Sequence, residues 1–492
     1  MTISSSDLAF PVSALLAAAF ILVSFALHRY AGGSRVVRAL RSPLCSRILL
    51  SLGAIGLAVE GTWSIPLHKS LPALIFALVL LLSLILTILW SVLPTEDPKS
   101  SLESSLESSP KPSPKPSPKP SPKPIPESNP ESRPNPSPGR TPASRRSLAY
   151  NLSHAGIAVI IFAALFGAPD ITRARMKVSE NQSVSVARSD DGLLVPLPFA
   201  ISLEQFVTEL YPGTDSPRQY KSRILIDGRP AEVSVNHPLC HSGYHIYQDS
   251  YDREYAKFTV LQVVRDPWRP LMYLGIALLA AGAVVLLLGQ WKSRQLIPAV
   301  LVLTLLFAFF SISRIEFGTL PPALRSWWFV PHLFIYMVAY SLMAIALVIR
   351  LLPDSPRRRF AKQPAPESPE IAAPPGTSGN PVATAEAPQT PADKRADLSR
   401  RLVRSSSALL ILGMLCGSVW AGQAWGNLWA WDPKENWAAV TWLLSLLLLH
   451  LPQRRSLKSA IILILTFAAL QITWYGVSYL PSSINSLHTY NQ

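Results

Sequence analysis

Long apolar runs without a charged side chain constrain this 492-residue chain more than any other feature of its sequence. The run Leu71–Val92 is one example. A helix of about 20 apolar residues crosses the hydrocarbon core of a bilayer and satisfies its own backbone hydrogen bonds there. We therefore expect a mainly α, polytopic membrane helix bundle with about ten spans. The expected spans are residues 8–27, 48–62, 71–92, 147–167, 271–288, 296–312, 330–352, 407–420, 438–451 and 460–480.

The basic residues indicate how these spans are oriented. The formal net charge is +15, and the arginines and lysines concentrate in loops. If all the spans form, every basic cluster falls on one side, which the positive-inside rule assigns to the cytoplasm. The first apolar run ends in Arg29 and a basic loop rather than a cleavage site, so it is expected to remain as a span. We expect a multi-pass protein of the bacterial inner membrane, with both termini extracytoplasmic and no nucleic-acid partner.

Two proline-rich stretches divide the chain. Residues 95–147, with the repeat SPKPSPKPSPKP, and residues 354–402 are expected to be cytoplasmic linkers. Residues 168–267 carry β-branched and aromatic residues in rough alternation, which predicts a small extracytoplasmic β-rich domain. The expected order is a three-span region (1–94), the first linker, two spans flanking the β domain (148–290), two further spans (291–353), the second linker and a C-terminal core (403–492).

The stretch 423–442, QAWGNLWAWDPKENWAAVTW, contains a cluster of tryptophans between two apolar runs. Tryptophan often anchors helices at a membrane surface, where the ring is apolar and the indole N–H stays hydrated. The density of rings here, mixed with glycine, proline and both signs of charge, exceeds what anchoring requires. We expect an aromatic shelf on the extracytoplasmic side that suits a large flat ligand.

Part of this stretch, WGNLWAWDPKENW, resembles the tryptophan-rich signature of the CcsA/ResC-like haem-handling membrane proteins of cytochrome c assembly. NLSHAGIAVIIFAALFG and VNHPLCHSGYHIYQDSY resemble the ResB-like partner family. The chain therefore resembles a fusion of the two, as in system II cytochrome c biogenesis. The resemblance implies that haem b is both ligand and substrate. The signature residues that it implies in haem binding are Trp425, Gly426, Trp429, Trp431, Asp432 and Trp437.

The charged residues of the signature leave several interpretations open. Asp432 and Glu435 could contact cationic residues of a protein substrate. Lys434 could equally pair with a haem propionate.

Two histidines are expected at the extracytoplasmic ends of spans, on the face of the tryptophan cluster. They are His332, at the start of the seventh span, and His488, just past the tenth. A single histidine at a helix end is often only an interfacial polar residue. Two neutral imidazoles on opposite faces of an iron porphyrin are a common bis-axial arrangement. The resemblance implies that His332 and His488 ligate haem iron, and we assign them the catalytic role as well.

A second pair is expected nearer the cytoplasmic face. His154 lies near the start of the fourth span and His450 at the end of the ninth. An ionisable side chain within a span is a candidate functional group because its burial is costly, although interfacial histidines that reach toward water are common. The resemblance implies that His154 and His450 hold haem iron before it reaches the outer pair.

The other histidines and the cysteines carry weaker signals. His237, His241 and His245 have helical metal-site spacing, but Pro238 and Gly243 favour a turn and a strand, which would separate the rings. His28 and His68 are expected in loops. The three cysteines are scattered and form neither CxxC nor CxxCH, so the chain is not itself a c-type cytochrome.

The resemblance implies a holocytochrome c synthase, or cytochrome c haem lyase. Such a protein moves haem outward and presents it for thioether attachment to the CxxCH motif of apocytochrome c. Its expected partners are apocytochrome c, haem, thiol-reducing proteins and membrane lipid. One alternative is a haem exporter or carrier without ligation activity. Another is a scaffold whose tryptophans only anchor helices, which predicts a colourless protein.

Overall fold

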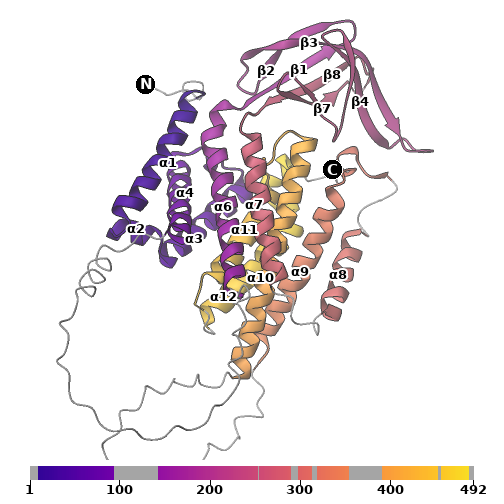
Figure 1. The fold of residues 1–492 in the computed structure, drawn as a ribbon. Coiled ribbons are helices and arrows are strands. Elements are labelled where there is room, and N and C mark those ends of the chain that lie inside the picture. The colour runs from indigo at the N-terminus through magenta and orange to yellow at the C-terminus, as the bar shows by residue number, and fades with distance from the viewer. Residues whose placement is uncertain are drawn as a thin grey trace, which may run out of the picture.

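The computed structural model describes residues 9–93, 142–252, 254–289, 297–312, 319–353, 390–452 and 456–486. Its helices form one bundle, and an antiparallel sheet covers one end of that bundle (Figure 1). We call this the sheet end, and the opposite one the far end. The expected fold class, a mainly α membrane bundle with a small β-rich domain, is confirmed.

Within the described residues, eight helices are long and apolar enough to cross a membrane. They are α1 (Val12–Ala31), α3 (Pro43–Trp63), α4 (Leu71–Val92), α6 (Pro142–Gly167), α7 (Arg269–Leu288), α9 (Phe329–Leu351), α10 (Pro391–Ala424) and α12 (Leu457–Trp474). The other two predicted spans are the shorter helices α8 (Ile297–Ile312) and α11 (Pro433–Leu449), with 16 and 17 residues. At 1.5 Å per residue each is roughly 25 Å long, against a hydrocarbon core of about 30 Å.

Several helix boundaries differ from the prediction. α1 continues to Ala31, so His28 lies in its last turn and the expectation of a loop there is wrong. α10 begins at Pro391 because Thr390 and Asp393 form a capping box, and it therefore extends well beyond the predicted eighth span. α12 ends at Trp474, since the 3₁₀ turns Gly476–Tyr479 and Pro481–Asn485 follow it.

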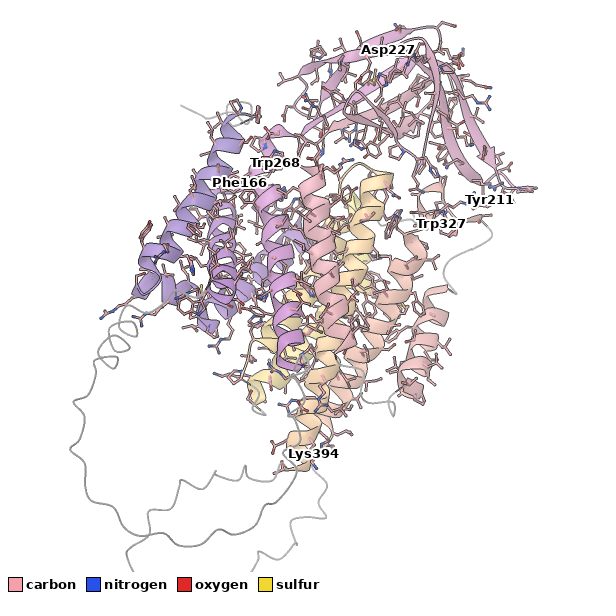
Figure 2. The ribbon with its side chains drawn as sticks, in the orientation of Figure 1. Phe166, Tyr211, Asp227, Trp268, Trp327 and Lys394 are labelled. Carbon is pink, nitrogen blue, oxygen red and sulfur yellow. The ribbon has the colours of Figure 1, made fainter. Side chains whose placement is uncertain are left out.

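The direction of the chain places each functional segment at one end of the bundle. α6 runs into the first strand and α7 leaves the last one, so both have one terminus at the sheet end. α9 begins at the sheet end, whereas α10 reaches it from the far end (Figure 1). Figure 2 shows Trp268 and Trp327 near the sheet and Lys394 at the far end. The connection between α10 and α11, which contains Trp425, Trp429 and Trp431, therefore lies beside the sheet.

The β domain is one eight-stranded antiparallel sheet with the order β5-β4-β3-β2-β1-β8-β7-β6. Along β1, inward and outward residues alternate, as a sheet with one buried face requires. The inner face buries Val178, Ile201, Ile224 and Ile246 completely. The strands are β1 (Thr172–Ser179), β2 (Ser183–Ser189), β3 (Leu194–Leu210), β4 (Pro217–Ile226), β5 (Arg229–Ser234), β6 (Leu239–His241), β7 (Tyr244–Tyr251) and β8 (Phe258–Arg265).

Asp170 fastens the sheet to the bundle. Its carboxylate accepts hydrogen bonds from the indole of Trp268 (2.5 Å), the hydroxyl of Ser13 (2.8 Å) and the backbone N–H of Phe10 (2.6 Å). These donors come from the approach to α7 and from the start of α1. One partly buried acceptor therefore joins the end of α6 to the approach to α7 and to the start of α1.

α6 and α7 lie against each other with glycines at their closest points. A Cβ atom at Gly156 would lie 2.5 Å from the backbone nitrogen of Leu279, and one at Gly282 would lie 2.4 Å from the Ser153 hydroxyl. Small residues allow this approach, which is a common way of packing helices within membranes.

We predict that Gly156→Ala destabilises the protein because its new methyl group meets backbone, which cannot move aside. Overpacking of this kind costs about 1–3 kcal/mol. The matched control is Gly56→Ala in α3, where a Cβ atom has nothing within 4 Å. Thermal unfolding in detergent should show a lower midpoint for Gly156→Ala only. Equal midpoints for the two variants would contradict this packing.

Candidate functional site

Both carboxylates of the tryptophan segment, residues 423–442, cap helix α11. Asp432 is 5% exposed and accepts hydrogen bonds from the backbone N–H of Lys434 (2.8 Å) and the hydroxyl of Ser486 (3.2 Å). Glu435 accepts from the backbone N–H groups of Ala430 (2.8 Å) and Asp432 (3.2 Å). These bonds satisfy donors that the start of a helix leaves unpaired, and they fix the turn before α11. The two carboxylates thus shape the segment, and this favours a structural role over contact with a cationic substrate.

The rings of the segment do not form one flat shelf. Trp429 and Trp431 are perpendicular, with 6.3 Å between their centroids and an interplanar angle of 87°. Trp425 lies 5.4 Å from Trp420 of α10 in a tilted arrangement. Trp437 packs against α3. The expectation of a flat shelf is therefore wrong, because the caps and the neighbouring elements turn the rings in different directions.

The β domain holds the first residues of the segment. Arg269 donates hydrogen bonds to the Tyr247 hydroxyl (3.0 Å) and to the Gly426 carbonyl (3.2 Å), while Gln262 donates to the Trp425 carbonyl (3.2 Å). Gly426 has φ +76°, and a Cβ atom there would lie 2.9 Å from the Tyr247 ring. Burial raises the pKa of the Tyr247 phenol, which therefore stays protonated at neutral pH. Carbonyls at the end of α10 thus find donors in or beside the sheet.

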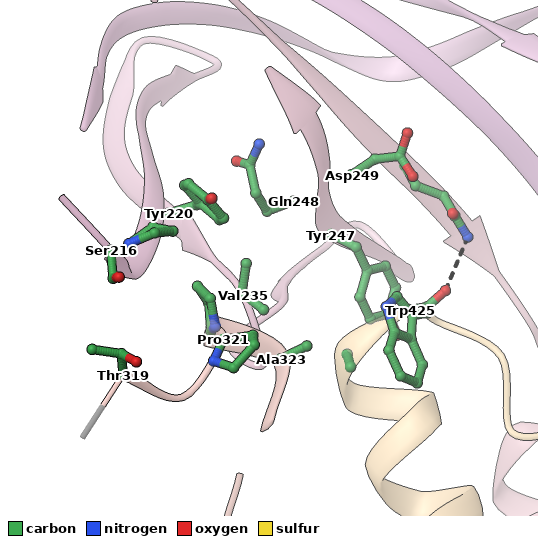
Figure 3. A pocket seen from close by; sticks show the side chains of 14 residues that line it. Ser216, Tyr220, Val235, Tyr247, Gln248, Asp249, Thr319, Pro321, Ala323 and Trp425 are labelled. Atoms are coloured by element: carbon green, nitrogen blue, oxygen red, sulfur yellow. Dashed lines mark hydrogen bonds between the residues drawn. The ribbon is translucent and has the colours of Figure 1, made fainter. Parts of the chain in front are cut away.

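A cavity of about 400 Å³ lies between the β domain, the loop before α9 and the end of α10 (Figure 3). Trp425 and Tyr247 line one side of it, and Ser216 and Tyr220 of the β4 region line another. Its walls mix aromatic rings with amide, hydroxyl and carboxylate groups. This composition suits a peptide better than a purely apolar ligand.

The loop that leads into α9 is fixed by both the β domain and α10. Asn236 is buried and donates to three carbonyl oxygens of this loop, the nearest at 2.9 Å. The Tyr211 hydroxyl donates to the Leu320 carbonyl (3.0 Å), and the Trp420 indole donates to the Ala323 carbonyl (3.0 Å). The β domain therefore helps to set the position of the first turn of α9. No motif in the sequence indicated these contacts, because they join residues far apart in the chain.

His332 lies in that first turn and points at α10. Its Nδ1 donates to the carbonyl of Gly413 (2.8 Å), since a carbonyl can only accept. A Cβ atom at Gly417 would lie 2.7 Å from the imidazole, so a glycine is needed there. The ring lies edge-on to Tyr336 (4.8 Å) and 6.1 Å from Trp420. Through Trp420 the histidine adjoins Trp425 and thereby the tryptophan segment.

Three of the predicted iron ligands share one tautomer. His154 Nδ1 donates to the Tyr150 carbonyl and His450 Nδ1 to the Leu446 carbonyl, each at 2.8 Å, as His332 does to Gly413. A neutral imidazole with its proton on Nδ1 carries the lone pair on Nε2, the atom that binds iron. His28 has the opposite arrangement, because its Nε2 bonds the Leu93 carbonyl. The Nε2 lone pairs of His154, His332 and His450 therefore suit a haem iron. The Nε2 atom of His28 does not, because it is already bonded to a carbonyl.

His154 and His450 lie at a different depth from His332. His450 is the C-cap of α11, so a helix of roughly 25 Å separates it from the turn before α11 that carries Trp429 and Trp431. His154 lies 13 residues before the end of α6 at Gly167, or roughly 20 Å from the sheet end. His154 and His450 are close enough for an electrostatic interaction if either imidazole is protonated. His488, the predicted partner of His332, lies outside the described residues.

The histidines near the β6–β7 hairpin have separate partners. His241 pairs with Asp227 (3.1 Å), whereas burial and the nearby Arg269 lower the pKa of His245. The strands β6 and β7 hold these two rings in the turn and strand that the sequence predicted.

Comparison with known proteins divides the chain in two. Residues 144–257 match the ResB-like family, and residues 269–485 match the family described as cytochrome C assembly protein. The cytochrome c biogenesis protein CcsA of Thermosynechococcus vestitus is 33% identical over 189 residues, which cover 34% of this chain and 59% of that protein. CcsA of Guillardia theta is 31% identical over 175 residues, which cover 34% and 56%. The chain thus spans less than two thirds of the length of these relatives.

The fold and these matches define the class as a multi-pass membrane protein with a cytochrome c assembly region. The chain joins that CcsA-like region to a ResB-like region, as in the system II fusion that its motifs predicted. Similarity to CcsA supports a role in cytochrome c biogenesis.

We predict that Gly426→Ala weakens the junction between the β domain and the tryptophan segment. The matched control is Gly192→Ala, a glycine with φ +83° and nothing within 4 Å of a Cβ atom. Both variants bear the left-handed backbone cost of about 1–2 kcal/mol, but only Gly426→Ala meets the Tyr247 ring. Thermal unfolding in detergent and tryptophan fluorescence should change more for Gly426→Ala. Equal changes would contradict a close approach at Gly426.

Proposed function

We propose that this protein binds haem b, moves it to the extracytoplasmic face of a bacterial inner membrane and presents it for attachment to apocytochrome c. The observation that carries this proposal is the placement of imidazoles with an Nε2 lone pair at two depths of one bundle. His154 and His450 lie toward the far end, and His332 lies beside the tryptophan segment. Similarity to CcsA proteins supports the assignment to cytochrome c biogenesis.

In this proposal, the far end faces the cytoplasm. The positive-inside rule supports that orientation, because the basic loops fall on that side in the predicted topology. His154 and His450 receive haem iron first, and His332 and His488 then hold it at the outer face. The N-terminus, the β domain, the tryptophan segment and the C-terminus are extracytoplasmic.

The protein's contribution to attachment is positioning rather than acid–base chemistry. Each thiol of CxxCH adds across one haem vinyl group, so that the S–H bond breaks, a C–S bond forms and the hydrogen ends on the other vinyl carbon. The addition has no net redox change, but both cysteines must arrive as thiols, which requires thiol-reducing partners. Rings of Trp425, Trp429, Trp431 and Trp437 form the aromatic surroundings, while Gly426 and Asp432 fix the shape of the segment.

We assign the cavity between the β domain and Trp425 to the apocytochrome. It is lined by amide and hydroxyl groups that can bond a peptide backbone, and Trp425 connects it through Trp420 to His332. A CxxCH segment bound there lies next to the aromatic surroundings of the haem.

A haem exporter or carrier that never forms thioethers is the second candidate. It would use the same histidines and tryptophans, so the two candidates differ in the product. Co-expression with an apocytochrome, followed by denaturing electrophoresis and haem staining, separates them. Covalently stained cytochrome supports the synthase, and its absence from cells with abundant haem-loaded protein supports the carrier.

We predict that the histidine pairs differ in their effect on haem. Purified wild-type protein should show a low-spin haem spectrum, because two imidazoles give a strong ligand field. That band should fade in His332→Ala and His488→Ala, whereas His154→Ala and His450→Ala should lower the total haem content. His28→Ala is the matched control, since that imidazole presents the wrong nitrogen. Equal haem content in all five variants would refute the proposed transfer of haem from the inner to the outer histidine pair.

We predict that filling the cavity blocks attachment without removing haem. Ser216→Trp places an indole among the lining residues, and Asp215→Trp changes the exposed neighbour. Ser216→Trp should keep the haem spectrum and reduce holocytochrome formation, whereas Asp215→Trp should do neither. Normal holocytochrome yield with Ser216→Trp would place the apocytochrome elsewhere.

A further inference from the structure

A carboxylate, an imidazole and an indole are joined in a row at the sheet end, and no sequence motif indicates this arrangement. Glu60 lies near the end of α3 and is 5% exposed. Its carboxylate pairs with Nδ1 of His68 and also accepts the backbone N–H of His68 (3.2 Å). The His68 ring stacks on the Trp431 indole, with 4.4 Å between centroids and 4° between planes.

The position of His68 is set by more than its bonds to Glu60. A Cβ atom at Gly61 would lie 3.0 Å from the Asn436 side chain, so the end of α3 lies directly against α11. The Ser482 hydroxyl donates to the Gly61 carbonyl (2.6 Å), which fastens the same point to the turn after α12. The end of α3, which carries Glu60, is therefore itself fixed by α11 and by the turn after α12.

Trp431 is the residue whose ring His68 positions. It has φ +59°, in the left-handed region that a bulky side chain rarely adopts, and it is 40% exposed. Asn436 donates to its carbonyl (3.1 Å), which fixes the backbone, whereas the stack on His68 fixes the ring. Trp431 in turn stands perpendicular to Trp429. The angle between these two indoles thus depends on a histidine from the N-terminal three-helix region.

We propose that His68, held by Glu60, is a positioning residue that orients Trp431 for haem at the outer face. The inference rests on the proposed function. It assigns to residues 1–94 a part in the haem site that neither matching family covers, since the matches begin at residue 144. His68 acts through Trp431, and the carboxylate–imidazole pair keeps its ring parallel to the indole.

The experiment compares four variants in the full chain purified in mild detergent. His68→Ala removes both the stack and the side-chain bond to Glu60, whereas His68→Phe keeps a flat ring but loses that bond. Glu60→Gln keeps an oxygen that accepts from Nδ1. His28→Ala is the matched control, because His28 is a buried histidine of the same three-helix region that lies edge-on to Trp90 (6.4 Å).

The readouts are the haem-to-protein ratio and the position of the Soret band. His68→Ala should weaken haem retention about two- to tenfold, as loss of one aromatic contact does, and should shift the band. His68→Phe and Glu60→Gln should recover part of both properties, and His28→Ala should match the wild type. If His68→Ala does not yield folded protein, the comparison of His68→Phe with His28→Ala still tests whether His68 affects haem retention.

A double-mutant cycle tests whether His68 acts through Trp431. The effects of His68→Ala and Trp431→Ala on haem retention should be less than additive, because each removes the same stack. Additive effects, or a His68→Ala protein with the spectrum and haem content of His28→Ala, would overturn the inference. A wild-type protein that never carries haem would overturn the proposed function instead, so the two failures are distinguishable.

Discussion

Backbone groups at two helix ends must find partners where the bundle meets the sheet, and much of the site follows from this requirement. α10 ends and α11 begins within a few residues, so carbonyls of one and N–H groups of the other are left unpaired by the helices themselves. Gln262 and Arg269 satisfy the Trp425 and Gly426 carbonyls, and Glu435 accepts from the turn before α11. Because such groups are costly to bury unpaired, these bonds determine the path of the tryptophan segment.

The same path imposes strain on Trp431. A left-handed backbone costs a non-glycine residue about 1–2 kcal/mol. A stacked aromatic pair contributes about 0.5–1.5 kcal/mol beyond its buried area, so the stack on His68 offsets part of that cost. Removing the stack leaves the backbone strain of Trp431 in place, and the contact that fixes the orientation of its indole ring is then lost. This comparison makes Trp431 the part of the segment most sensitive to its neighbours.

Sequence patterns could predict the elements but not how they meet. Apolar runs located the ten helices because bilayer burial selects apolar residues, and alternation in 168–267 located the strands. The tryptophan motif could be recognised from local composition, whereas His28 was misplaced in a loop because α1 continues to Ala31. The perpendicular rings of Trp429 and Trp431 could not be predicted, since they depend on a capping box and on His68, which is remote in the chain. The role of Asp432 could not be predicted either, because an aspartate at this position can contact a ligand or cap a helix.

Two regions from outside the cytochrome c assembly match hold the tryptophan segment from different sides. Tyr247 of the ResB-like region packs on Gly426, and His68 of the N-terminal region stacks on Trp431. Separate proteins would have to associate to make these contacts, and each association would cost translational and rotational freedom. A single chain replaces that step by an intramolecular one with a high effective concentration. Fusion therefore keeps the segment supported even when the individual contacts are as modest as one stacked ring and one hydrogen bond.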